Sequence, residues 1–345
     1  MNVPNFGIRR WILAVALLSM VVAYSRADAV TIDWVTVGDP GNTADFTTYG
    51  AVADAFQIMK FEWTNSQYVE FLNAVDPDGT NPNSVYNNDM GSNARGGISF
   101  TSGNTAGSKY APKTNMGDKP VNYVGWFDAA RVANWLQNGQ GSGSTETGAY
   151  TLNGATTGNA PAVNSGATYY IPTQDQWYKA AYYEGGGTTA VYWNYATQSD
   201  TDPTAVTADG TGDGSAGSTG NFANFDTAAD WNGLDGNVTT VGTNGGPSAY
   251  GTFDMSGNVY EWNDLDGLAA SGSSRGLRGG GWISIASDLS SSVRFSSDPS
   301  NENFGIGFRL ASPVPVPEPS TWVMGLAGIA CGGWGLLRRR QAPSP

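Results

Sequence analysis

The stretch FDMSGNVYEW at residues 253–262 is the most informative part of this chain. It belongs to a series of short motifs that follow one another along the sequence. The others are FEWTN at 61–65, KPVNYV at 119–124, IPT at 171–173, LRGGGW at 277–282 and GIGFR at 305–309. A single short motif arises by chance in many proteins, so the ordered series is the informative observation.

Two helices are predicted from their capping signals. The T-x-x-Q pattern occurs twice, at Thr64 with Gln67 and at Thr173 with Gln176. In this pattern each of the two side chains accepts a hydrogen bond from a backbone N–H group at the start of the helix. Apolar residues with a helical period follow both pairs. We therefore expect helices that begin at both threonines, the second of which ends near Gly185.

The remaining pattern predicts an α+β domain with little regular structure. A further helix is expected from Gly125 to Asn138, because its alanine, valine and leucine residues fall on one face. Strands are expected at 56–59, 168–171 and 305–310, and long surface loops at 139–166 and 197–220. No linker divides residues 30–312, so we expect a single domain there.

The ordered motifs closely resemble those of the formylglycine-generating enzyme (sulfatase-modifying factor) family. The resemblance runs from about residue 56 to residue 311. It implies a variant of the C-type-lectin-like fold, which is an α+β body with low regular secondary structure and long loops.

The catalytic residues of that family are missing from this chain. The family's enzymes oxidise a sulfatase cysteine to formylglycine with two copper-binding thiols, which lie shortly after the R-G-G-x-W motif. Here residues 283–290 read ISIASDLS, and a serine hydroxyl replaces neither the soft copper ligand nor the redox partner. The related sulfoxide synthases of ergothioneine biosynthesis hold iron with histidine, which this chain lacks. We therefore assign no catalytic residue and expect no copper.

The composition excludes several other functions. With no histidine and a single cysteine, the chain can form neither a Ser-His-Asp triad nor an internal disulfide, and it has no Cys/His zinc site. Its formal net charge of −13 argues against binding to nucleic acid, which requires clustered Lys and Arg. Only 14% of the residues are charged and 47 are glycines, which is typical of loop-rich extracellular domains.

Residues 1–29 are predicted to be a signal peptide. Arg9 and Arg10 precede an apolar run at 11–23 that is too short for a comfortable membrane span. Ala27 and Ala29 then supply the small-x-small pattern, so cleavage is expected after Ala29. A twin-arginine signal is the alternative to Sec export.

Residues 313–345 are predicted to be a sorting segment. Until this segment is cleaved, the protein is expected to contact the membrane only through it. A proline-rich stretch precedes a short apolar helix at 322–337 and a basic cluster. This order closely resembles the PEP-CTERM signal of Gram-negative bacteria, which here comprises Pro317, Glu318, Pro319, Arg338, Arg339 and Arg340. The resemblance implies cleavage by an exosortase and a place at the cell surface or in the extracellular matrix. A plain single-span anchor is the alternative.

Two calcium sites are implied by the resemblance to the formylglycine-generating enzymes. The first would use the side chains of Asp254 and Glu261 and the carbonyls of Gly257 and Val259. Calcium takes such mixtures of carboxylate and backbone oxygens, although both acids could instead only accept hydrogen bonds from loop amides. The second site would use Asp235 and Asn237 together with either Asn221 or Asn224.

Two hypotheses about function follow. In the favoured one, the chain is a non-catalytic surface protein in which calcium stiffens a scaffold whose loops bind an exopolysaccharide or a surface protein. Tyr192, Trp193 and Tyr195 are the candidate sugar-binding residues, because aromatic rings on a surface loop can stack on sugars. Motif arginines such as Arg278, Arg294 and Arg309 are expected to bridge loop carbonyls and carboxylates.

The alternative hypothesis is an enzyme with altered, non-copper chemistry in the ancestral active-site groove. It would use Ser284, Ser287, Asp288 or nearby tyrosines on a substrate that the sequence does not identify.

Overall fold

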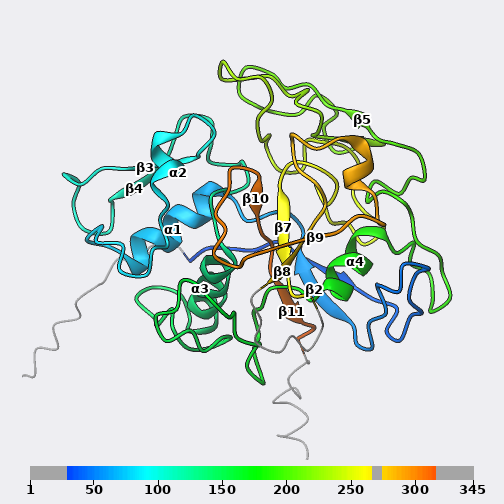
Figure 1. Ribbon diagram of the computed structural model, residues 1–345, viewed down its shortest axis with the longest axis horizontal. Helices are drawn as coiled ribbons and strands as arrows, with labels where there is room; N and C mark the ends of the chain where they lie inside the picture. Colours follow the sequence, from blue (N-terminus) through cyan, green and yellow to red (C-terminus); the bar gives the residue numbers. More distant parts are fainter. Residues whose placement is uncertain (1–28, 266–273, 316–345) are drawn as a thin grey trace, which may run out of the picture.

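The computed structural model describes residues 29–265 and 274–315 (Figure 1). Its helices are short, and they are α1 (Asn65–Val75), α2 (Asn88–Ser92), α3 (Trp126–Gln137) and α4 (Gln174–Tyr182). In Figure 1, α1, α2 and α3 lie on one side of a small central sheet and α4 lies on the other. The predicted α+β class with long irregular segments is confirmed.

Two small sheets organise the strands. The three-stranded sheet has the order β1 (Trp34–Val37), β2 (Phe56–Met59), β11 (Ala311–Pro313), and both outer strands run antiparallel to β2. The four-stranded sheet has the order β10 (Ile306–Gly307), β7 (Tyr260–Asn263), β8 (Arg275–Arg278), β9 (Phe295–Ser297). Two further pairs join β3 (Ile98–Phe100) with β4 (Tyr110–Pro112) and β5 (Thr204–Ala205) with β6 (Phe222–Ala223).

Both predicted capping boxes are present. Thr64 accepts a hydrogen bond from the Gln67 amide at 3.3 Å, and the Gln67 side chain accepts one from the Thr64 amide at 3.0 Å. Thr173 and Gln176 make the same pair of bonds at the start of α4. The helix α4 ends at Tyr182, before the predicted Gly185, because Tyr183 takes an extended conformation and pairs with Tyr192 in a β-bridge.

Two of the three predicted strands are wrong in extent, while residues 56–59 form β2 as expected. Residues 168–171 contribute only a bridge between Tyr170 and Ala311. Residues 305–310 form a strand only at β10, because the chain then leaves that sheet. The Phe308 carbonyl accepts a hydrogen bond from Trp63, and the Leu310 carbonyl accepts one from Met59 on β2.

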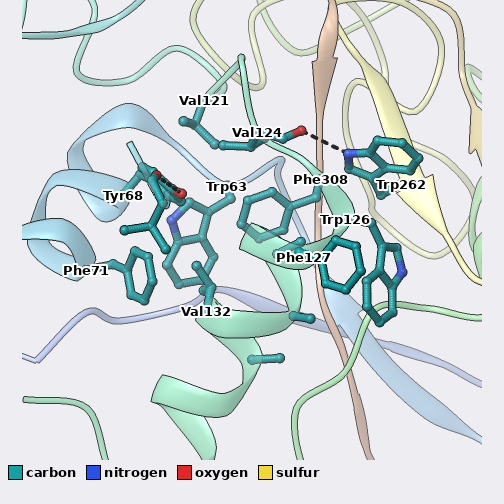
Figure 2. Packing of buried hydrophobic residues seen from close by; sticks show 14 of the residues in the cluster. Trp63, Tyr68, Phe71, Val121, Val124, Trp126, Phe127, Val132, Trp262 and Phe308 are labelled. Atoms are coloured by element: carbon teal, nitrogen blue, oxygen red, sulfur yellow. Dashed lines mark hydrogen bonds between the residues drawn. The ribbon is translucent and has the colours of Figure 1, made fainter. Parts of the chain in front are cut away.

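Several motif residues pack in the core together with apolar residues of α1 and α3 (Figure 2). Trp63 of the FEWTN motif and Phe308 of the GIGFR motif stack with their ring centroids 5.7 Å apart. The buried indole of Trp262 donates a hydrogen bond of 3.0 Å to the Val124 carbonyl. These motifs pack against one another, and their tryptophans Trp63, Trp262 and Trp282 are all buried.

Candidate functional site

The segment that follows the LRGGGW motif contains no thiol, and its Ser284 has a structural role. Ser284 is 5% exposed. Its hydroxyl accepts a hydrogen bond of 3.1 Å from the Gly281 amide and donates one of 3.0 Å to the Tyr260 hydroxyl. This side chain ties the turn after β8 to the start of β7.

The surroundings of Ser284 do not activate it as a nucleophile. Burial raises the pKa of the Tyr260 hydroxyl, and Asp288 adds to this shift, so Tyr260 stays protonated at neutral pH. Within residues 29–265 and 274–315, no carboxylate or amine forms a hydrogen bond with Ser284. Ser287 is exposed on the 3₁₀ turn Ala286–Leu289, which also carries Asp288. The geometry therefore lacks the adjacent base that nucleophilic serines require.

Apolar side chains cover the surface around this serine. Ile283 and Ile285, on either side of Ser284, are 46% and 60% exposed. Phe295 on β9 is 45% exposed and packs edge-on against the Tyr260 ring, with centroids 5.6 Å apart. The segment that follows the LRGGGW motif thus exposes apolar side chains.

The first predicted calcium set surrounds a buried ion pair. Glu261 accepts hydrogen bonds from Arg309 at 2.6 Å and 2.7 Å and from the Trp177 indole at 2.8 Å. Asp254 is half-buried and accepts bonds from the Gly242 amide at 2.5 Å and from Asn244 at 2.9 Å. A calcium ion bound by Glu261 would compete with Arg309 and Trp177 for its oxygens, and calcium binding by this set stays a prediction.

A third carboxylate at this place was not singled out by the sequence. Glu62 is buried and accepts hydrogen bonds from the Asn258 side chain at 2.8 Å and from the Val259 amide at 3.3 Å. Burial and the nearby Asp254 and Glu261 raise the pKa of Glu62 well above its usual range. The sequence around Glu62 does not indicate that its side chain is a buried acceptor, since its partners Asn258 and Val259 lie almost 200 residues away.

The second predicted calcium set is brought together only in part. Asn224 is buried and donates a hydrogen bond of 2.9 Å to the Asn237 carbonyl, whereas Asn221 binds Ser199 and Asp202 elsewhere. The structure therefore selects Asn224. Its side-chain oxygen is buried without a hydrogen-bond partner, which leaves an oxygen free for a cation. The Asp235 side chain is exposed. Calcium binding here stays a prediction.

No dense cluster of metal-binding side chains stands out elsewhere. Among the described residues, no three His, Cys, Asp or Glu side chains are grouped so that they could hold a metal ion. The second predicted set would accordingly combine one carboxylate, that of Asp235, with amide or backbone oxygens.

The candidate sugar-binding aromatics pack against the body of the protein. Tyr195 is 5% exposed and donates a hydrogen bond of 2.7 Å to Asp202. The Tyr192 ring packs on Tyr183, with centroids 4.8 Å apart, and its hydroxyl donates to the Thr43 carbonyl at 2.8 Å. The indole nitrogen of Trp193 is buried. The structure gives these residues packing contacts, and sugar binding by them stays a prediction.

The motif arginines have different roles. Arg309 also donates to the carbonyls of Met59 and Phe253, and Arg278 donates to those of Ser291 and Val293, as expected. Arg294 is exposed and binds the Tyr49 hydroxyl. It therefore bridges no carbonyl or carboxylate in the described residues.

The predicted targeting segments fall almost entirely outside the described residues. These are the signal peptide with Ala27, and the sorting residues from Pro317 to Arg340 with the apolar stretch 322–337. None of the helices that the structure does describe has the length and apolar character needed to cross a membrane.

Two family models match the chain. Residues 36–314 match the sulfatase-modifying factor enzyme 1-like domain, and residues 315–341 match the PEP-CTERM protein-sorting motif. The serine/threonine-protein kinase pkn1 of Chlamydia pneumoniae is 37% identical over 84 residues, which are 20% of this chain and 14% of that protein. The chain thus spans about a seventh of the length of this curated relative.

Solved structures share the architecture. CarF is similar with a TM-score of 0.50 and 22% identity, over 83% of this chain and 99% of CarF. Treponema denticola variable protein 1 is similar with a TM-score of 0.49 and 19% identity, over 83% of this chain and 96% of that protein. At such identities, the similarity to CarF speaks for the fold alone.

Proposed function

Because the chain belongs to the sulfatase-modifying factor enzyme 1-like domain family and carries a PEP-CTERM sorting motif, we propose that it is an exported, non-catalytic surface protein. It would use the fold of the family as a scaffold for binding. Its ligand would be an exopolysaccharide or another surface protein.

A single observation carries this proposal, namely the chemistry of residues 283–290. The segment has no sulfur, and its one buried hydroxyl, that of Ser284, is used in hydrogen bonds to Gly281 and Tyr260. Copper-dependent oxidation of a cysteine needs a thiolate that is both metal ligand and redox partner. The exposed Ile283 and Ile285 make this surface suited to contact rather than to chemistry.

The sorting motif supports the proposed location. In this proposal an exosortase recognises Pro317 to Pro319 and removes the tail. The protein would then lie at the cell surface or in the extracellular matrix of a Gram-negative-type bacterium.

Calcium would stabilise the scaffold through Asn224, Asp235 and Asn237. The unpartnered, buried oxygen of Asn224 supports this set over the one that includes Glu261, whose oxygens bind Arg309 and Trp177. A bound calcium ion would cross-link two parts of the long segment between β6 and β7, and thereby stiffen a part of the chain with little regular structure.

Three measurements test the proposal that the protein is non-catalytic and binds matrix material. The purified full chain, held in mild detergent, should contain no stoichiometric copper and should not convert the cysteine of a sulfatase-motif peptide to an aldehyde. It should be retained by extracellular matrix material prepared from the source cells. Stoichiometric copper or aldehyde formation would refute the proposal, as would failure to bind any matrix component.

A further inference from the structure

Two surface cavities lie side by side next to the start of α4. Their volumes are about 350 Å³ and about 370 Å³, and they share the lining residues Tyr170, Thr173 and Gln176. The loop 162–167 forms the far wall of the first cavity, and residues 51–56 form the far wall of the second. Both volumes fall in the range of small-molecule sites, roughly 300–1,000 Å³.

The wall between the cavities is held rigid by hydrogen bonds. The Tyr170 hydroxyl accepts a bond of 3.0 Å from the Gln176 amide group, and the Gln176 oxygen accepts one of 3.1 Å from the Thr173 backbone. Tyr170 is also fixed through its backbone, which pairs with Ala311. In the described part of the chain the Tyr170 hydroxyl donates to no acceptor. An ordered half-buried ring with a free donor binds a ligand at little entropic cost.

The polar side chains around this ring are those that recognise hydroxyl groups. Asn164 lines the first cavity and is held by bonds to the Gly148 carbonyl and to Thr151. Asp175 lines the second, and only one of its oxygens is used, by the Gly50 amide at 2.9 Å. Both side chains are therefore positioned before a ligand arrives.

The second cavity is negatively charged, whereas the carboxylate of the first is paired with an arginine. Asp54 and Asp175 line the second cavity, and Asp264, which pairs with Arg275 at 2.9 Å, lines the first. No lysine or arginine is among the residues found to line either cavity. Acidic groups on a ligand would be repelled by these carboxylates, whereas hydroxyl and amino groups would be attracted.

We propose that the two cavities bind neighbouring units of a linear glycan that carries hydroxyl or amino groups and no acidic groups, with Tyr170 between the units. The proposal rests on the binding function proposed above and gives it a place and a ligand class. It moves the sugar-binding residues from Tyr192, Trp193 and Tyr195 to Tyr170, Gln176 and the carboxylates beside them.

The test uses the full chain in mild detergent and three sets of linear hexose oligomers, which are neutral, amino-bearing and uronic-acid-bearing. Calorimetry should detect binding of the neutral or amino-bearing oligomers and none of the acidic ones. Tyr170→Ala should weaken this binding about tenfold or more, as truncation of a central contact does. Tyr169→Ala is the matched control, because Tyr169 is also half-buried but lines neither cavity, and it should bind normally.

Two further variants keep the test decisive if Tyr170→Ala fails to fold. Ala162→Trp and Ala53→Trp each place a large ring in one cavity from an exposed position, so the fold should tolerate them. Each should also reduce binding about tenfold or more.

The outcomes separate this proposal from the function on which it rests. Binding that none of the variants changes would place the glycan elsewhere and leave the binding function intact. Binding of acidic oligomers alone would overturn the ligand class. No binding of neutral or amino-bearing oligomers at millimolar concentration would overturn the whole inference, while capture of the protein by matrix material would still support the binding function.

Discussion

The guanidinium of Arg309 binds both carboxylate oxygens of Glu261, and neither side chain is exposed to solvent. The pair links the GIGFR motif to the GNVYEW motif, and it joins the last strands of the chain to the centre of the four-stranded sheet. Glu62 and Asp254 also face this guanidinium. One buried cation thus lies among three acids, of which it binds Glu261 directly.

Arg309→Met should destabilise the protein by about 3–5 kcal/mol, because it leaves the buried charge of Glu261 without its counter-ion. Urea unfolding followed by tryptophan fluorescence measures this loss. The double variant Arg309→Met/Glu261→Gln should lose less, since no uncompensated charge remains. An equal loss in both variants would show that packing, not charge, dominates at this site.

Calcium should raise the melting temperature of the full chain relative to the same sample in EGTA, because a ligand that binds only the folded state stabilises it. Asp235→Asn should remove the calcium-dependent shift, and the exposed Asp33→Asn should not. If Asp254→Asn alone removed the shift, calcium would bind at the first predicted set. An absent shift in the unmodified chain would refute calcium stabilisation.

The free energy of unfolding should fall as the pH rises from about 4 to about 6. Burial raises the pKa of Asp264 to about 6, and it raises the pKa of Asp128 well above its usual range. In this window the folded state keeps protons that the unfolded state has lost, so the stabilisation decreases with rising pH. Chemical unfolding over a pH series measures the slope.

Asp264→Asn should flatten this pH dependence. The exposed Asp118→Asn should leave it unchanged. An unchanged slope in Asp264→Asn would remove Asp264 from the group of responsible residues.

Ser284→Ala should cost about 1–3 kcal/mol, since the buried Gly281 amide loses its acceptor. The exposed Ser287→Ala should change stability by less than about 0.5 kcal/mol. Matrix binding should survive both changes. An enzymatic turnover that Ser284→Ala abolished, with stability unaltered, would instead support altered chemistry in the ancestral groove.

Deletion of all residues after Val316 should release the protein into the medium or leave it in the periplasm, because the motif that the exosortase recognises is gone. Fractionation and immunoblotting of the source cells measure the distribution. A distribution identical to that of the full chain would contradict the sorting role.

The features that the sequence predicted well are local or family-wide. Capping boxes at Thr64 and Thr173 involve residues three positions apart, so both helix starts were visible. The end of α4 could not be predicted in this way, since it depends on the pairing of Tyr183 with Tyr192 across a loop. Likewise, Tyr170 was predicted in a strand, but only one bridge forms there, and the ring lines two cavities instead.

The candidate site was less predictable because its contacts are distant in sequence. Nothing near Glu261 indicates that its oxygens bind Arg309, which lies 48 positions later. The choice between Asn221 and Asn224 also required the fold, because both lie in one polar stretch and only the buried one meets Asn237. Carboxylates and amides in an Asn-rich chain offer many such alternatives, and packing selects among them.

Strands β1 and β11 flank β2 and run in the same direction, so the chain enters the three-stranded sheet at one end and leaves it at the other. A pull on the carboxyl end, such as a surface tether would transmit, acts along β11. The backbone bonds between β11 and β2 would then share the load in shear instead of opening one after another. The geometry of these strands thus sets which backbone bonds would bear such a pull.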